Sequence, residues 1–372
     1  MLYFENFWYN KDIMKKAILY KKLENNKVRC LACSHQCFID DEQTGICGVR
    51  QNKDGDLYLL VYNKPISVNI DPIEKKPLFH FMPGQKIFSL GTIGCNFGCD
   101  FCQNWEISQL PKTVETIRET SYERQRESWL PEIIVKHCQE NKIPMIACTY
   151  NEPTIWTEYA YDIMKLAKEE GINPSTSLRI NGEQSRTIKN VWVSNGFMSE
   201  KTLDLISPYL DAINIDLKSF SEDFYKKICK ARLEPVKENI RKIWKKGIWI
   251  EVTTLVIPGI NDSDKELKQI AEFLKNISKD IPWHISAFYP SYKMIDILPT
   301  PQETLVRAYQ IGKDAGLKYV YTGNIPDSNY ESTYCPKCNL LLIKRLGLGM
   351  VDNKLSNGKC PQCGEGIAGR FK

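Results

Sequence analysis

The segment IFSLGTIGCNFGCDFCQNWEISQ, residues 87–109, joins a strand pattern to a group of cysteines. Its apolar start, residues 87–94, is typical of a strand buried on both faces of a parallel sheet. Three cysteines follow at the spacing C-x3-C-x2-C, namely Cys95, Cys99 and Cys102. Three thiolates would leave one iron of a four-iron cube without a protein ligand, whereas a structural cluster normally uses a fourth cysteine. Taken alone, the motif also permits a cluster completed by Cys138 or Cys148, or a zinc site.

Strand and helix patterns alternate after this segment, as expected for a parallel sheet with crossover helices. Further strands are expected at residues 145–150, 191–195, 212–217, 249–257, 283–289 and 318–322. Helices are expected at residues 131–142, 157–171, 199–207, 235–247 and 264–276. Six or seven such units favour an α/β fold with a full or partial barrel, and we expect a partial (β/α)6 TIM-like barrel over residues 86–330. The active site of such a barrel lies at the carboxyl ends of its strands.

Two CxxC pairs near the end of the chain predict a metal site in residues 331–372. They are Cys335 with Cys338 and Cys360 with Cys363, and 21 residues separate the pairs. This spacing is close to that of a zinc ribbon, in which two turns supply four thiolates to one ion. A rubredoxin-like iron site uses the same geometry, but nothing else in the segment indicates redox work. We therefore expect zinc in a zinc-ribbon-like or rubredoxin-like module.

A second group of cysteines predicts a metal-binding N-terminal segment over residues 1–85. Its members are Cys30, Cys33, Cys37 and Cys47. The first three lie close together in the sequence and the fourth follows after a longer interval, unlike the two CxxC pairs of a ribbon. Thiolates suit both zinc and iron–sulfur clusters, so a structural zinc and an auxiliary cluster both stay open. The lone Cys138, Cys148 and Cys229 are expected to be buried as small hydrophobic residues.

Composition limits the remaining classes of function. With 42% hydrophobic and 26% charged residues, and no apolar run near the roughly 20 residues of a membrane span, no membrane role is indicated. Residues 1–20 lack the features of a secretory signal, so we expect a cytoplasmic protein with reduced thiols. A net charge of +5 from 50 basic and 45 acidic residues permits nucleic-acid binding without favouring it.

The cysteine motif, with Phe101 before its last cysteine, resembles the signature of the radical S-adenosylmethionine (SAM) superfamily. The resemblance covers about residues 30–366 and is greatest to the radical SAM enzymes of the AmmeMemoRadiSam system, relatives of pyruvate formate-lyase activating enzyme. Nine blocks match in order: CLACSHQC, TGICGVRQN, DPIEKKPLFHFMPG, GCNFGCDFCQNWEISQ, TYNEPTIW, IDLKSF, TTLVIPGINDSD, WHISAFYPSYKM and YCPKCNLLLI. Nine ordered blocks are far more specific than one cysteine triplet.

This resemblance implies a 4Fe-4S cluster on Cys95, Cys99 and Cys102 whose open iron binds SAM. Reductive cleavage of SAM would then yield a 5′-deoxyadenosyl radical that abstracts a hydrogen atom. The residues that the resemblance assigns to SAM contacts follow the strands: Phe101, Tyr150, Asn151, Glu152, Asn195, Asp216, Lys218, Asn261 and His284. Four of them have structural alternatives, beginning with Glu152 as a charge at a helix N-terminus, and Asp216 and Lys218 as surface residues. A satisfied core histidine is the alternative for His284.

The resemblance also implies partners and leaves several functions open. It implies a reductant such as flavodoxin or ferredoxin, and Memo-like and AMMECR1-like proteins as partners. The leading hypothesis is a radical enzyme that acts on a protein or small metabolite. The alternatives are a glycyl-radical-enzyme activase, an RNA-modifying radical enzyme and a non-enzymatic, metal-binding electron carrier. The chain departs from the family pattern at residues 173–190, a polar insertion that is expected to form a surface loop.

Overall fold

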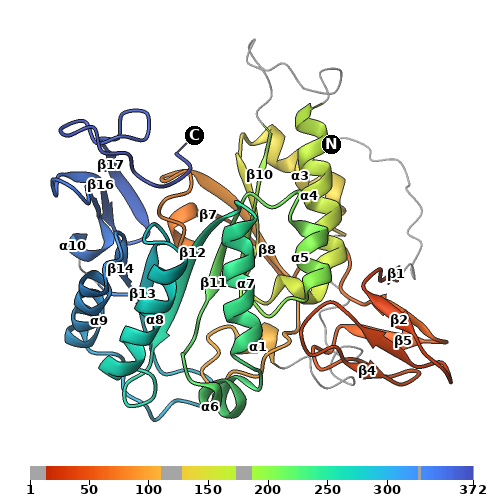
Figure 1. The fold of residues 1–372 in the computed structure, drawn as a ribbon. Helices are drawn as coiled ribbons and strands as arrows, with labels where there is room; N and C mark the ends of the chain where they lie inside the picture. Colours follow the sequence, from red (N-terminus) through yellow and green to blue (C-terminus); the bar gives the residue numbers. More distant parts are fainter. Residues whose placement is uncertain (1–13, 110–127, 173–186, 326–327, 372) are drawn as a thin grey trace.

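The computed structural model describes residues 14–109, 128–172, 187–325 and 328–371 (Figure 1). Most of the expected 173–190 loop therefore lies outside the described residues. The main sheet has eight strands in the order β14-β13-β12-β11-β10-β9-β8-β7. Their bounds are β7 Ser67–Pro72, β8 Lys86–Gly91, β9 Met145–Cys148, β10 Lys189–Ser194, β11 Ala212–Asp216, β12 Trp249–Val256, β13 Trp283–Ala287 and β14 Val320–Gly323.

The seven strands β8 to β14 are parallel to their neighbours, whereas β7 runs antiparallel to β8. The sheet is an open array with β7 and β14 at its edges. The predicted α/β fold with a partial barrel is thus confirmed, with seven parallel strands. The antiparallel edge strand β7 was not predicted, and it lies before the boundary expected at residue 86.

Helices connect the parallel strands and cover the sheet on the outside (Figure 1). The helical elements are η1 Ile73–Lys75, α1 Trp105–Ser108, α3 Pro131–Glu140, η4 Pro153–Trp156, α4 Thr157–Ile172, α5 Glu200–Ile206, α6 Glu222–Phe224, η5 Tyr225–Cys229, α7 Glu234–Lys245, α8 Asp264–Ile277, α9 Gln302–Ala315 and α10 Ser328–Glu331. Their start signals are local: for example, the Ser263 side chain accepts a hydrogen bond from Glu266 N, 3.3 Å away, at the start of α8. The apolar faces of these helices pack on one face of the strands in one large core, and apolar residues of the other face, such as Ile87, Met145 and Val191, form a separate cluster.

The N-terminal segment forms two small sheets, β1-β6-β5 and β2-β3-β4. Their strands are β1 Lys15–Lys16, β2 Tyr20–Lys22, β3 Val28–Cys30, β4 Phe38–Ile39, β5 Arg50–Lys53 and β6 Asp56–Leu59. The segment contacts the barrel through the loop that follows β10 and the start of α5. Ser34 N donates to Phe197 O (2.9 Å), and Thr202 Oγ1 donates to Ala32 O (2.6 Å). It therefore lies at the carboxyl ends of the strands.

The C-terminal module, β15 Thr333–Tyr334, β16 Leu341–Leu346 and β17 Gly349–Asn353, lies at the opposite end of the barrel (Figure 1). Its buried Arg345 donates to Phe79 O (2.6 Å), and Arg370 N donates to His80 O (2.7 Å). Phe79 and His80 in turn donate their amides to Glu251, near the start of β12. These hydrogen bonds attach the module to the start of β12, whereas the cysteine loop follows the end of β8. Among the helices of the described residues, none is long and apolar enough to cross a membrane.

Candidate active site

The loop after β8 carries Cys95, Cys99 and Cys102 and is held closely against its surroundings. Gly94 has φ +87°, and a Cβ there would lie 2.5 Å from the carbonyl oxygen of Cys47. A Cβ at Gly91 would lie 2.4 Å from the oxygen of Thr149 at the end of β9. Both positions require glycine because no side chain fits. The loop is therefore fixed between the sheet and the N-terminal segment.

The three thiols of this loop form a donor set suited to a group larger than one ion. Cys99 is buried, whereas Cys95 and Cys102 are half-buried, and Phe97 N lies 3.4 Å from Cys95 Sγ as a hydrogen-bond donor. Among the described residues, only the C-terminal cysteines bring three or more ligand atoms within 4.8 Å of one another. The loop thiols are thus spread more widely than the ligands of a single metal. This spacing and the absence of a fourth thiol in the loop fit a cluster with one open iron.

Asn151 fixes the cysteine loop to the end of β9. Its Nδ2 donates to Gly94 O (2.9 Å) and Thr92 Oγ1 (3.1 Å), and its Oδ1 accepts from Thr92 N (3.2 Å) and Trp156 Nε1 (3.1 Å). All four hydrogen-bonding positions of this amide are therefore used within the chain. Asn151 acts as a clamp on the loop.

The Glu152 carboxylate is also hydrogen-bonded within the protein. Its side chain is 2% exposed, and its oxygens accept from Asn195 N (2.7 Å), Ser194 Oγ (2.8 Å) and Thr154 N (3.0 Å). Burial raises the pKa of Glu152, and these hydrogen bonds oppose that shift. The Asn195 side chain then donates to Asn96 Oδ1 (2.8 Å), beside Cys95. Glu152 therefore positions the end of β10 against the cysteine loop.

Asp216 and Lys218 lie beside the thiol of Cys99. Lys218 Nζ is 2.8 Å from Asp216 Oδ2 and 5.6 Å from the centre of the Phe101 ring. Burial alone would lower the pKa of Lys218, but Asp216 and the thiols of Cys99 and Cys229 hold it well above its usual value. The Asp216 side chain is 36% exposed. This pair therefore offers an accessible carboxylate and ammonium next to the cysteine loop.

A family model described as the radical SAM superfamily matches residues 90–274, which include the loop and four of the strand ends described above. The chain belongs to the radical SAM superfamily. A relative from Methanocaldococcus jannaschii, the uncharacterized protein MJ0808, is 41% identical over 357 residues, which cover 95% of this chain and 99% of the relative. The protein is accordingly a radical SAM enzyme.

Two further similarities are more distant. The Methanocaldococcus jannaschii protein MJ1632, named as a candidate glycyl-radical enzyme activating enzyme, is 25% identical over 65% of this chain and 80% of its own length. A solved domain of a pyruvate-formate lyase-activating enzyme from Bacteroides vulgatus is 20% identical, with a TM-score of 0.36, over 48% of this chain and 98% of that domain.

The other predicted SAM-contact residues of this radical SAM enzyme lie in different surroundings. Asn261 is fully buried and donates to Lys218 O (2.7 Å) and Leu255 O (2.8 Å), so it joins the ends of β11 and β12. Tyr150 has φ +69°, and its hydroxyl donates to Asp71 Oδ2 (2.6 Å) on the edge strand β7. His284 is the second residue of β13, 2.6 Å from Glu251, at the end of the barrel opposite the cysteine loop. The structure does not bring His284 together with the other predicted residues.

One residue of the site, Cys229, was not predicted from the sequence to lie beside the cysteine loop. Cys229, at the end of η5, is hydrogen-bonded to Cys99; this contact and burial raise the pKa of the Cys99 thiol. The Cys229 carbonyl also accepts from Gly98 N (2.9 Å). Cys138, Cys148 and Cys229 all lie in the core as expected. No spacing in the sequence links Cys229 to the motif, because 126 positions separate it from Cys102 along the numbering and only the fold joins them.

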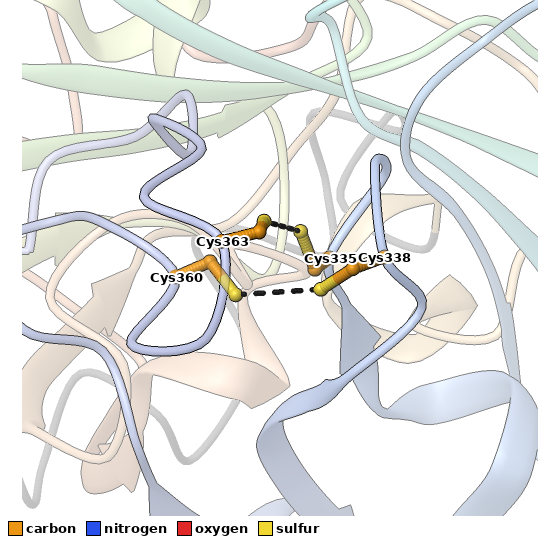
Figure 2. Close-up of side chains that lie close together, drawn as sticks. All are labelled: Cys335, Cys338, Cys360 and Cys363. Carbon is orange, nitrogen blue, oxygen red and sulfur yellow. Dashed lines mark hydrogen bonds between the residues drawn. The ribbon is translucent and has the colours of Figure 1, made fainter.

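The C-terminal cysteines form a compact four-thiol group (Figure 2). Cys335 Sγ lies 3.6 Å from Cys363 Sγ, and Cys338 Sγ lies 3.6 Å from Cys360 Sγ. A tetrahedral zinc site with Zn–S bonds of about 2.3 Å separates its sulfur atoms by about 3.8 Å. The four residues therefore fit one tetrahedral metal ion. This site is far from the cysteine loop because the module lies at the other end of the barrel.

Proposed function

We propose that the protein binds a 4Fe-4S cluster through Cys95, Cys99 and Cys102, cleaves SAM reductively there, and directs the radical to a protein or small-molecule substrate. When bound and reduced, the cluster supplies the electron that breaks the bond between sulfur and the 5′-carbon of SAM. The observation that carries the proposal is the position of the three widely spaced thiols beside the Asp216–Lys218 pair. Membership in the superfamily supports the same chemistry.

Lys218 and Asp216 are the best candidates for direct contacts with SAM. An ammonium can pair with the methionyl carboxylate, and a carboxylate can accept hydrogen bonds from ribose hydroxyls. Because Lys218 is held in its charged form and Asp216 is partly exposed, both groups are ready for a polar ligand. We assign Phe101, whose ring lies under the Lys218 ammonium, to the apolar wall of this site.

We assign positioning roles to Asn151, Glu152 and Asn261, because their polar atoms are already hydrogen-bonded within the chain. They would hold the cysteine loop and the strand ends in place for SAM. Asn195 would transmit the position of Glu152 to the cysteine loop through Asn96. Tyr150, which lies next to Asp71 and Lys76, is a candidate for a contact with SAM inside the barrel. For His284 we propose a structural role with Glu251.

A glycyl-radical-enzyme activase is the second candidate function. It is favoured by the relative named for that activity, which matches 80% of its own length. Such an activity would leave a stable radical on a glycine of a partner enzyme, detectable by electron paramagnetic resonance. Either function requires a low-potential reductant such as flavodoxin or ferredoxin, and Memo-like and AMMECR1-like proteins are the first partners to test. Zinc is our proposal for the C-terminal site.

The test is anaerobic reconstitution with iron and sulfide, followed by dithionite and SAM, with chromatography of 5′-deoxyadenosine and methionine. We expect both products from the wild-type protein and from Cys138→Ala, which changes a buried cysteine of α3. We expect neither product from Cys99→Ala. A wild-type protein that loads its cluster fully, is reduced, and still leaves SAM intact would overturn the proposal.

A further inference from the structure

The four N-terminal cysteines surround one cavity. Its lining includes Cys30, Cys33, Cys37 and Cys47 together with Arg50 and Asn96. Three of these cysteines are buried and Cys37 is partly exposed. Four cysteines that line one cavity form a ligand set, because isolated structural cysteines pack against carbon atoms instead.

The spacing of these thiols differs from that of a single-ion site. The C-terminal sulfur atoms lie within 4.8 Å of one another, but no three ligand atoms of the N-terminal group do so. The thiols are nevertheless neighbours, because all four cysteines line the same cavity. An iron–sulfur cube binds each thiolate to a different iron, so it needs a ring of sulfur atoms wider than that around zinc.

A buried hydrogen-bond donor at the cavity lacks a partner. Asn96 is 1% exposed, and its Oδ1 accepts from Asn195 Nδ2 (2.8 Å). Its Nδ2 has no hydrogen-bond acceptor within the part of the chain that the structure describes. An unpaired buried donor costs about 1–3 kcal/mol. The inorganic sulfides of a cluster are acceptors that would satisfy this amide, and such hydrogen bonds are typical of cluster sites.

Charge and backbone groups also favour bound thiolates. Arg50, which is 1% exposed and paired with Glu158, lines the cavity and places a cationic group beside the thiols. The backbone amides of Ala32 and Val49 hydrogen-bond to the sulfur atoms of Cys30 and Cys47. These groups stabilise negative charge on sulfur inside the protein, where an isolated thiolate would be costly.

We propose that Cys30, Cys33, Cys37 and Cys47 hold a second 4Fe-4S cluster, ligated by four thiolates and therefore closed to SAM. It lies next to the cysteine loop of the barrel, because Asn96 lines its cavity and directly follows Cys95. His35 Nε2, which is 2.9 Å from Asn96 O, joins the same two segments. The proposal concerns the resting protein and does not depend on the cleavage of SAM.

The experiment uses the full chain with Cys95→Ala, Cys99→Ala and Cys102→Ala, which removes the ligands of the first cluster. The protein is reconstituted anaerobically with iron and sulfide, desalted, and assayed for iron, sulfide and zinc. We expect about four iron and four sulfide atoms per chain, as for a cube on four cysteines, and one zinc at the C-terminal site. Visible absorption should bleach on reduction with dithionite.

Two further variants of this triple-alanine protein, the background variant, identify the cysteines that bind the iron. Adding Cys30→Ala and Cys33→Ala should remove the iron and sulfide and leave the single zinc, whereas adding Cys138→Ala should change neither. Circular dichroism checks that each chain is folded, and the background variant decides the question if the added pair unfolds the protein. Two zinc atoms and no iron in the background variant would overturn the proposal. About two iron atoms would overturn the four-iron assignment.

Discussion

The side-chain amide of Asn195 donates to Oδ1 of Asn96 across 2.8 Å, and both residues are buried. This hydrogen bond joins the end of β10 to the residue that follows Cys95. It therefore couples the strand ends of the barrel to the loop that carries the three thiols. The same Asn96 lines the cavity of the N-terminal cysteines.

Asn195→Ala should loosen this connection. The change leaves Asn96 Oδ1 without its buried donor, which costs about 1–3 kcal/mol. We expect a lower free energy of unfolding by that amount and faster removal of iron by a chelator from the reconstituted protein. Denaturant titration and the rate of iron release measure the two effects. Asn141→Ala, at the exposed end of α3, is the matched control, and an equal effect there would contradict a specific role of Asn195.

Lys218→Met should weaken the binding of SAM while the cluster stays loaded. A charge-assisted hydrogen bond contributes about 1.5–3 kcal/mol, so we expect the dissociation constant to rise at least about tenfold. Equilibrium dialysis of the reconstituted protein with labelled SAM measures this change. The control is Lys237→Met, which removes a similarly buried lysine on α7 that pairs with Glu234. Unchanged affinity in Lys218→Met would exclude a contact with SAM.

Glu158→Gln should destabilise the junction between the N-terminal segment and the barrel. Arg50 and Glu158 form an ion pair in which both side chains are 1% exposed. Removing the carboxylate leaves the guanidinium buried without a counter-charge, which costs about 3–5 kcal/mol. Glu272→Gln removes the exposed partner of Lys268 on α8 and should cost less than about 1 kcal/mol. Denaturant titration of both variants tests the difference, and equal losses would contradict this account.

The sequence predicted the central strands well because parallel strands covered on both faces are continuous apolar runs. Trp249–Val256 is an example: seven of its eight residues are buried. The edge strand Ser67–Pro72 was not predicted, since it has two exposed residues, ends in proline and has no apolar run. Its pairing with β8 is a property of the fold and not of its own pattern.

The candidate site was predicted in part for a related reason. The family resemblance and the predicted strand ends together made Asn151, Glu152 and Asp216 candidate contacts. Their hydrogen bonds do not follow from it. The polar side-chain atoms of Asn151 and Glu152 are hydrogen-bonded within the protein, whereas the Asp216 side chain stays partly exposed. Cys229 carried no signal, because its contact with Cys99 is created by η5 folding back onto the loop.

His80 should make the protein less stable as the pH falls. Burial lowers the pKa of His80 from 6.5 to about 4, and Glu251 only partly opposes this shift. As the pH falls, His80 binds a proton in the unfolded chain before it does so in the folded protein. The contribution of neutral His80 to the free energy of unfolding is therefore complete above about pH 6.5 and is lost as the pH falls towards 4. At pH 5 the loss is about 2 kcal/mol. We expect His80→Gln to show a flatter decline of the unfolding free energy between pH 7 and pH 5, whereas an unchanged slope would assign the decline to other groups.

Cys338→Ser with Cys363→Ser should remove the C-terminal metal and release the module from the barrel. These two half-buried thiols belong to opposite pairs of the four-cysteine group, so their loss leaves two ligands for the ion (Figure 2). Because the metal replaces much of the core that such a small module lacks, we expect protease cleavage within residues 331–371 while the barrel stays intact. Metal analysis should show the loss of one zinc per chain. Retained zinc, or protection of the module equal to that of the wild type, would contradict a metal-dependent module. The matched control is Cys148→Ser in the core strand β9, which should lower stability without changing the zinc content.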